Sequence, residues 1–257
     1  VKCKNFRKHD LIVIGDGPKN KNDEKNVFEA RKIAKHKLDK NTQFIFSKKN
    51  KGLSKSIIDG VTNTINKYEK AIIIEDDLKL HESFLEYMQN ALDFFQDNDQ
   101  VYSVSGYAYK DMNNSETDEP MFLPFISTWG WGTWKSAWET FDHNSKGSEK
   151  LFRNNDLRHL FDVNGVYPFS DMLESQKQGR VDSWGIRWYW TLFNQKKLCC
   201  YPRNSLVIND GYDNEATNGR GWANNFNKKK MFIEDIRPTK FFNKEVKVDE
   251  MYYHHVT

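Results

Sequence analysis

Apolar positions in the first 110 residues alternate between short continuous runs and positions three or four residues apart. The continuous runs, which predict strands, lie at residues 11–14, 43–46, 71–74 and 101–104. The stretches with helical spacing lie between and after them, at residues 27–34, 53–65 and 84–95. Because strand and helix alternate, we expect an α/β protein with a mostly parallel, doubly wound sheet flanked by helices.

The remaining residues, 111–257, are less regular and rich in tryptophan, asparagine and glycine. Residues 129–138 are expected to lead into a helix, and residues 184–193 predict a second aromatic helix. A Gly/Asn-rich stretch at 209–227 is typical of a long binding loop. We expect both halves of the chain to form one domain over residues 1–257.

Three adjacent carboxylates, Glu75, Asp76 and Asp77, follow the apolar run at 71–74. A run without polar alternation predicts a strand buried on both faces, as in the parallel centre of a sheet. Acids at its carboxyl end repel one another unless a cation or hydrogen-bond donors compensate. Mg²⁺ or Mn²⁺ held there would keep positions for phosphate oxygens, which points to a nucleoside-diphosphate substrate. The alternative is a simple acidic turn.

Two further features suggest an anionic ligand near the first strand. Asp16 follows that strand, where it is expected either to accept hydrogen bonds from a base or ribose or to stabilise its Gly-flanked turn. Lys51, Gly52 and Lys55 surround a helix start, whose free N–H groups favour an anion such as a diphosphate. A helix that opens with glycine and lysine is common, so this signal has low specificity.

The tryptophans have two interpretations. Trp134 and Trp138 lie four residues apart and are expected in the core. Trp129 and Trp131 are separated by glycine, and they either join the core or present indole faces to a sugar.

Asp182 precedes the second aromatic helix, where it either caps the helix or acts as a general base toward an acceptor hydroxyl. Asp142, Asp171 and Glu174 are rival acids for that role.

Composition narrows the function classes. The formal net charge of +3 is too small to indicate nucleic-acid binding, and no RNA-binding or zinc-finger motif accompanies it. Three cysteines, two of them adjacent, predict no disulfide framework, so a cytoplasmic setting is the simplest expectation. Lys228, Lys229 and Lys230 lie between aromatic residues, which suggests either a solvated charge run or a peripheral contact with the inner face of a membrane.

Taken together, these residues resemble the nucleotide-sugar glycosyltransferases of GT-A fold, in particular bacterial relatives of the N-acetylglucosaminyltransferase I type. The resemblance covers nearly the whole chain. The motifs that carry it occur in the family's order: Asn-Lys-Gly-Leu at 50–53, Ile-Ile-Ile-Glu-Asp-Asp-Leu at 72–78, the helix from Phe84, Ser-Val-Ser-Gly at 103–106, Trp-Gly-Trp at 129–131, Asp-Ser-Trp at 182–184 and Tyr-Pro at 201–202.

The resemblance implies a role for each acid. Asp77 would bind the metal that bridges the donor diphosphate, with Glu75 and Asp76 supporting donor binding. Asp16 would contact the nucleoside, and Asp182 would be the catalytic base. Residues 1–110 would form the nucleotide-sugar and metal-binding half, and residues 111–257 the acceptor-binding half.

One departure from the family concerns the start of the chain. Family members open with a strand and helix that help to hold the base, whereas Val1 corresponds to a point late in that helix. We therefore expect the family's first strand to be missing and donor affinity to be affected.

The expected function is a metal-dependent, inverting transfer of a sugar from a nucleoside-diphosphate sugar to a glycan or lipid-linked saccharide, with Mn²⁺ or Mg²⁺ as cofactor. A sugar-phosphate nucleotidyltransferase and a non-catalytic carbohydrate-binding protein are the alternatives.

Overall fold

The computed structural model describes residues 3–112, 117–211, 236, 238–241, 243 and 245–257. Its main sheet has five strands in the order β3 (Lys70–Ile73), β7 (Trp131–Trp134), β5 (Val101–Ser105), β8 (Leu198–Tyr201) and β6 (Met121–Leu123). β5 and β8 are parallel, whereas β7 is antiparallel to both β3 and β5, and β6 is antiparallel to β8.

The α/β class is confirmed, but the expectation of a mostly parallel sheet is wrong. β3, β5 and β8 share one direction, and β6 and β7 run against them. The two reversed strands come from the less regular part of the chain, where β7 occupies part of the segment expected to lead into a helix. Because a reversed strand needs no helical crossover, the strand and helix alternation of the first 110 residues does not reveal it.

The strand before the acids also differs from the expectation. β3 is an edge strand that pairs with β7 alone in the described sheet. Ala71 is buried, Ile72 and Ile73 are half-buried, and Ile74 lies beyond the strand with 43 % of its surface exposed. The continuous apolar run therefore marks an edge strand covered by a helix, because α2 (Leu53–Tyr68) packs against it.

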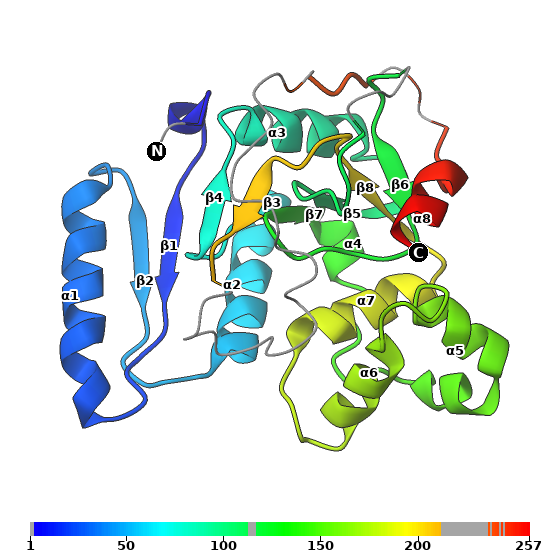
Figure 1. The fold of residues 1–257 in the computed structure, drawn as a ribbon. Coiled ribbons are helices and arrows are strands. Elements are labelled where there is room, and N and C mark those ends of the chain that lie inside the picture. The colour runs from blue at the N-terminus through cyan, green and yellow to red at the C-terminus, as the bar shows by residue number, and fades with distance from the viewer. Residues whose placement is uncertain (1–2, 113–116, 212–235, 237, 242, 244) are drawn as a thin grey trace.

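Two smaller sheets flank the main one. β1 (Ile12–Gly15) pairs in parallel with β2 (Gln43–Phe46), and α1 (Lys21–Lys37) connects them. β4 (Leu78–Leu80), which follows the acids, pairs with the antiparallel strand β9 (Val207–Asn209). Figure 1 shows α1, β2 and β1 at one side of the molecule, with α2 between them and the rest.

Helices cover both faces of the main sheet. α3 (Phe84–Phe94) packs on one face, and α2, α4 (Lys135–Trp138) and α7 (Trp184–Asn194) form the core on the other. The remaining helices are η1 (Phe6–Lys8), η2 (Ser148–Arg153), α5 (Asn155–Phe161), α6 (Phe169–Lys177) and α8 (Glu250–Val256). Among the described helices, none combines the length and apolar character needed to cross a bilayer.

Neighbouring residues of the central strands point into different cores. On β8, Cys199 belongs to the cluster formed with α2 and α7, and Cys200 to the cluster formed with α3. Trp134 and Trp138 are each 5 % exposed, which confirms that both lie in the core. The main sheet therefore separates two hydrophobic cores that are both rich in aromatic residues.

Candidate active site

The acidic run forms a turn between β3 and β4. The backbone N–H of Leu78 donates to the carbonyl of Glu75 at 3.4 Å. Burial, and then the charges of Asp77 and Asp76, raise the pKa of Glu75 to about 7. Asp76 is exposed. The turn therefore holds one inward carboxyl group and one solvent-facing carboxylate within two residues.

Asp77 is packed closely against residues 210–211, which follow β9. Its backbone carbonyl accepts the N–H of Asp210 at 2.8 Å. A Cβ added to Gly211 would lie only 2.3 Å from Asp77 Oδ2, so the chain approaches this carboxylate more closely than any side-chain-bearing residue allows. Burial, followed by the charge of Asp76, raises the pKa of Asp77.

One oxygen of Asp77 has no hydrogen-bond partner among the described residues. Oδ1 is buried, and none of the described donors reaches it. A buried carboxylate oxygen without a partner is costly, and a divalent cation would satisfy it. Asp77 is therefore the residue of this turn best suited to hold Mg²⁺ or Mn²⁺.

The described residues contain no group of three His, Cys, Asp or Glu side chains placed to share a metal. Mg²⁺ bound together with a phosphorylated substrate commonly uses one or two carboxylates, with phosphate and water oxygens as the other ligands. Asp77 alone fits such a site, although a cage made entirely of protein ligands would need more groups.

Asp16 lies at the start of α2 and receives several backbone donors. Its carboxylate accepts the N–H groups of Gly17 at 2.8 Å, Lys51 at 2.9 Å and Gly52 at 2.8 Å, and the side-chain amide of Asn50 at 3.1 Å. Although desolvation opposes the shift, these N–H groups lower the pKa of Asp16 below its ordinary value. The anion expected at this helix start is thus supplied by the protein itself.

Lys51 does not reach toward an open anion site in this arrangement. Its ammonium group pairs with Asp59, the seventh residue of α2, at 2.9 Å. Lys55 pairs with the same carboxylate at 3.3 Å. Asp16 therefore stabilises its turn, which is one of the two roles expected from the sequence. A contact between a nucleotide and Asp16 or Lys51 stays a prediction.

Asp182 precedes α7 but does not cap it. The cap is Ser183, whose hydroxyl accepts the N–H of Ile186 at 3.4 Å. Asp182, whose side chain is 66 % exposed, accepts instead from Arg187 Nη2 at 2.9 Å. The carboxylate is consequently oriented and open to solvent.

Arg187 connects the starts of two helices. Besides Asp182, its Nη2 donates to the hydroxyl of Ser54 in the first turn of α2. Because Asp16 binds Gly52 at the same helix start, Asp16 and Asp182 are brought to one region by separate contacts. The sequence reasoning missed Arg187, although its position five residues after Asp182 on a helix was a usable signal.

Trp131 lies in the core between the acidic turn and α7. It pairs with Ile73 in the sheet, and its ring stacks on Trp184 with centroids 5.2 Å apart. It is fully buried, so the expectation that it presents an indole face to a sugar does not fit this packing. Trp131 instead links the end of β3, two residues before Glu75, to the start of α7, two residues after Asp182. Trp129 is half-buried against Tyr107.

The rival acids have local partners. Asp142 accepts the N–H groups of Asn144 and Lys146, and Asp171 pairs with Arg158 at 2.6 Å. Glu174 accepts from the side chain of Gln178, one turn along α6. Asp182 differs from them because its partner also contacts α2.

A cavity of about 200 Å³ lies at the amino end of β5, lined in part by Asp97, Tyr102 and Trp134. It contains none of the candidate residues. Lys228, Lys229 and Lys230 lie outside the described residues, as do residues 212–227 of the stretch that was expected to form a binding loop. Neither a scan of protein-family models nor a search among curated proteins finds a match for this chain.

Proposed function

We propose that the chain is a metal-dependent glycosyltransferase that moves a sugar from a nucleoside-diphosphate sugar to a hydroxyl of a glycan or lipid-linked saccharide, with inversion. The observation that carries this proposal is the buried Oδ1 of Asp77, which has no hydrogen-bond partner in the described part of the chain. It lies beside Glu75 and Asp76 at the carboxyl end of β3. Burial, and then the charges of the neighbouring carboxylates, raise the pKa of both Glu75 and Asp77, as expected for a carboxylate group that lacks a compensating positive charge.

On the donor side, Asp77 would hold Mn²⁺ or Mg²⁺, which supplies positive charge to stabilise the departing nucleoside diphosphate. Glu75 and Asp76 would support donor binding from the same turn. Asp16 would act as a positioning residue, because its carboxylate fixes the backbone of residues 51–52 next to the expected nucleoside.

On the acceptor side, Asp182 would remove the proton of the attacking hydroxyl. Its orientation by Arg187 and its exposure to solvent both suit a base that must meet an incoming substrate. The packing of Trp131 on Trp184 supports this assignment, since it fixes the start of α7 relative to the end of β3.

The test is a screen of nucleoside-diphosphate sugars with and without Mn²⁺, in which thermal unfolding and product release are both followed. A true donor at about a hundredfold excess over its dissociation constant should raise the unfolding midpoint by about 5–10 °C, and only when Mn²⁺ is present. Asp77→Ala should abolish this shift. Asp97→Ala, which removes an exposed acid at the other end of the sheet, should keep it.

Product analysis separates the alternatives. Release of nucleoside diphosphate together with sugar transfer supports the proposal. Release of pyrophosphate from a nucleoside triphosphate and a sugar phosphate would instead identify a nucleotidyltransferase. Glycan binding without turnover of any donor would identify a carbohydrate-binding protein.

A further inference from the structure

One flank of α1 carries four lysines in line with an exposed phenylalanine. Lys21, Lys25, Phe28, Lys32 and Lys35 are separated by four, three, four and three residues, which places them in one stripe along the helix. We call these five residues the lysine stripe. Phe28 is 65 % exposed, the highest fraction among the exposed large apolar side chains that the structure describes.

Within the described part of the chain, the lysines of the stripe have no acidic partners. Lys21, Lys25, Lys32 and Lys35 make no ion pair with any described carboxylate. The charge extends beyond the helix: residues 17–51 hold eleven Lys and Arg against four Asp and Glu, a net of +7, although the whole chain carries only +3. Positive charge is therefore concentrated in this one segment, and the rest of the chain is net negative.

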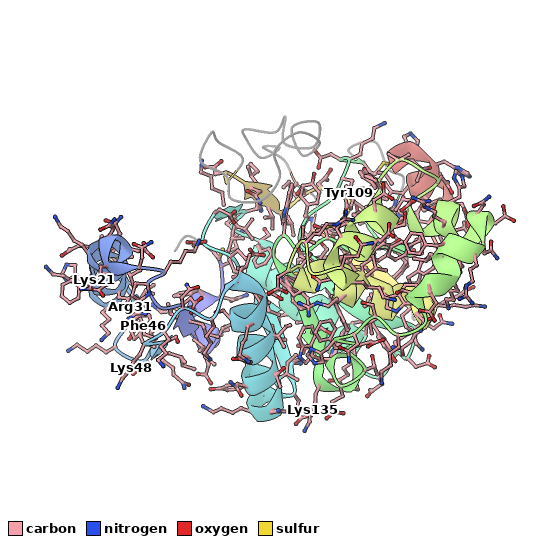
Figure 2. The ribbon with its side chains drawn as sticks, turned by 90° about the horizontal axis from the view of Figure 1, so that it is seen from below. Lys21, Arg31, Phe46, Lys48, Tyr109 and Lys135 are labelled. Atoms are coloured by element: carbon pink, nitrogen blue, oxygen red, sulfur yellow. The ribbon has the colours of Figure 1, made fainter. Side chains whose placement is uncertain are left out.

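Arg31 fixes the helix that carries the stripe. Its Nη2 donates to the carbonyls of Asp16 at 2.8 Å and Ser47 at 2.7 Å, and its guanidinium lies 4.9 Å from the ring centroid of Phe46. Lys35 lies over the same ring at 5.6 Å. Figure 2 shows Lys21, Arg31, Phe46 and Lys48 grouped at one end of the molecule, remote from Tyr109. The stripe is thus a preorganised surface.

We propose that the lysine stripe docks on an anionic phospholipid bilayer, with the ammonium groups at the headgroup phosphates and Phe28 inserted at the boundary with the acyl chains. A helix with basic side chains around an exposed aromatic residue has both attractions that an interfacial helix uses. A nucleic acid would use the charge, but it would leave Phe28 without a comparable apolar environment. The proposal is independent of the catalytic assignment.

Arg31 also relates the docking surface to the candidate active site. It binds the backbone of Asp16, and the carboxylate of Asp16 binds the start of α2. Docking through α1 would therefore hold this helix start in a defined orientation to the bilayer.

The test is sedimentation of the full chain with phosphatidylcholine vesicles that contain or lack phosphatidylserine. Binding should require phosphatidylserine and weaken at high salt. Lys25→Glu with Lys32→Glu should reduce the partition coefficient by at least about tenfold, since each lysine near an anionic surface contributes several-fold. The matched charge control, Lys146→Glu with Lys247→Glu, changes two exposed lysines elsewhere and should bind as the unaltered protein does.

Phe28→Ala should also reduce partition by about tenfold, because an inserted aromatic side chain is lost. Ile33→Ala is its control, since Ile33 is exposed on α1 but lies outside the stripe. The proposal is overturned if binding is unaffected by phosphatidylserine, if Ile33→Ala weakens it as much as Phe28→Ala, or if duplex RNA or DNA competes fully while Phe28→Ala has no effect. Unchanged circular dichroism would show that each variant is folded, as expected for exposed positions.

Discussion

Arg187 holds the carboxylate of Asp182 at an Nη2–Oδ1 distance of 2.9 Å, and the same nitrogen reaches Ser54 in α2. The arginine is only 12 % exposed, whereas the aspartate is 66 % exposed. The solvent-facing carboxylate of Asp182 is therefore anchored by a nearly buried arginine that also connects α7 to α2. Because the aspartate is the exposed partner, we expect Asp182→Asn to leave the protein folded, which circular dichroism would check.

Asp182→Asn should lower turnover by at least about a hundredfold, the usual contribution of a general base, while donor affinity stays unchanged. Steady-state kinetics combined with calorimetric titration of the donor separates the two effects. Asp171→Asn, which alters an exposed acid paired with Arg158, is the control and should keep turnover. Near-normal activity of the Asp182 variant would remove that residue from the mechanism.

Gly211→Ala should impair metal-dependent donor binding, because the new Cβ would meet Asp77 Oδ2 at 2.3 Å. Gly179→Ala is the control: that glycine has a φ of +70° but no neighbour within 4 Å of an added Cβ, so it should cost about 1 kcal/mol of stability without affecting the donor. Adding Asp77→Ala should recover part of the stability that Gly211→Ala loses, since it removes the clashing carboxylate and leaves a Cβ contact at 3.0 Å. If the single variant binds donor normally, this close approach has no role in the site.

Glu75→Gln should stabilise the protein above neutral pH when divalent cations are absent. The pKa of Glu75 is about 7 in the folded state, above its ordinary value of 4.5, so the folded protein binds more protons between these two pH values. Its contribution to stability therefore falls as pH rises from about 4.5 to 7, by at most about 3 kcal/mol. Urea unfolding of both proteins at pH 4 and pH 8 measures this: the variant should gain only at pH 8. An equal gain at both pH values would contradict the burial of this carboxyl group.

Asp16→Ala should destabilise the protein by about 1–3 kcal/mol, because the N–H groups at residues 17, 51 and 52 lose a shared charged acceptor. Asp39→Ala removes an exposed carboxylate that accepts the single N–H of Asn41, and it should cost less. Denaturant midpoints compare the two variants. Equal, small losses would mean that the Asp16 contacts do not hold the start of α2.

The regular elements of residues 1–110 could be predicted because their apolar spacing is strong. The strand at 43–46 is matched by β2, and helices were expected where α1, α2 and α3 lie. Strand direction was not predictable, since periodicity reports which face a side chain occupies and not which strand lies beside it. The segment Trp131–Trp134 is an example. Its aromatic and glycine residues did not indicate a strand, yet it forms β7, which pairs antiparallel with both β3 and β5.

The candidate site was predicted in part. The sequence located the acidic turn and the acid before α7, but it did not show that Asp16 is engaged by backbone donors or that Trp131 is buried. Both outcomes depend on contacts between residues more than thirty positions apart along the chain. The local spacing of apolar and polar residues does not predict such contacts.

The adjacent cysteines of β8 provide a separate chemical probe for each of the two hydrophobic cores. Both thiols are fully buried, one on each side of the sheet, and burial raises the pKa of Cys199 to about 12. An alkylating reagent can modify either sulfur only after the corresponding layer has opened. The order in which the two sulfurs become modified would consequently reveal whether the α3 layer or the α7 layer separates first.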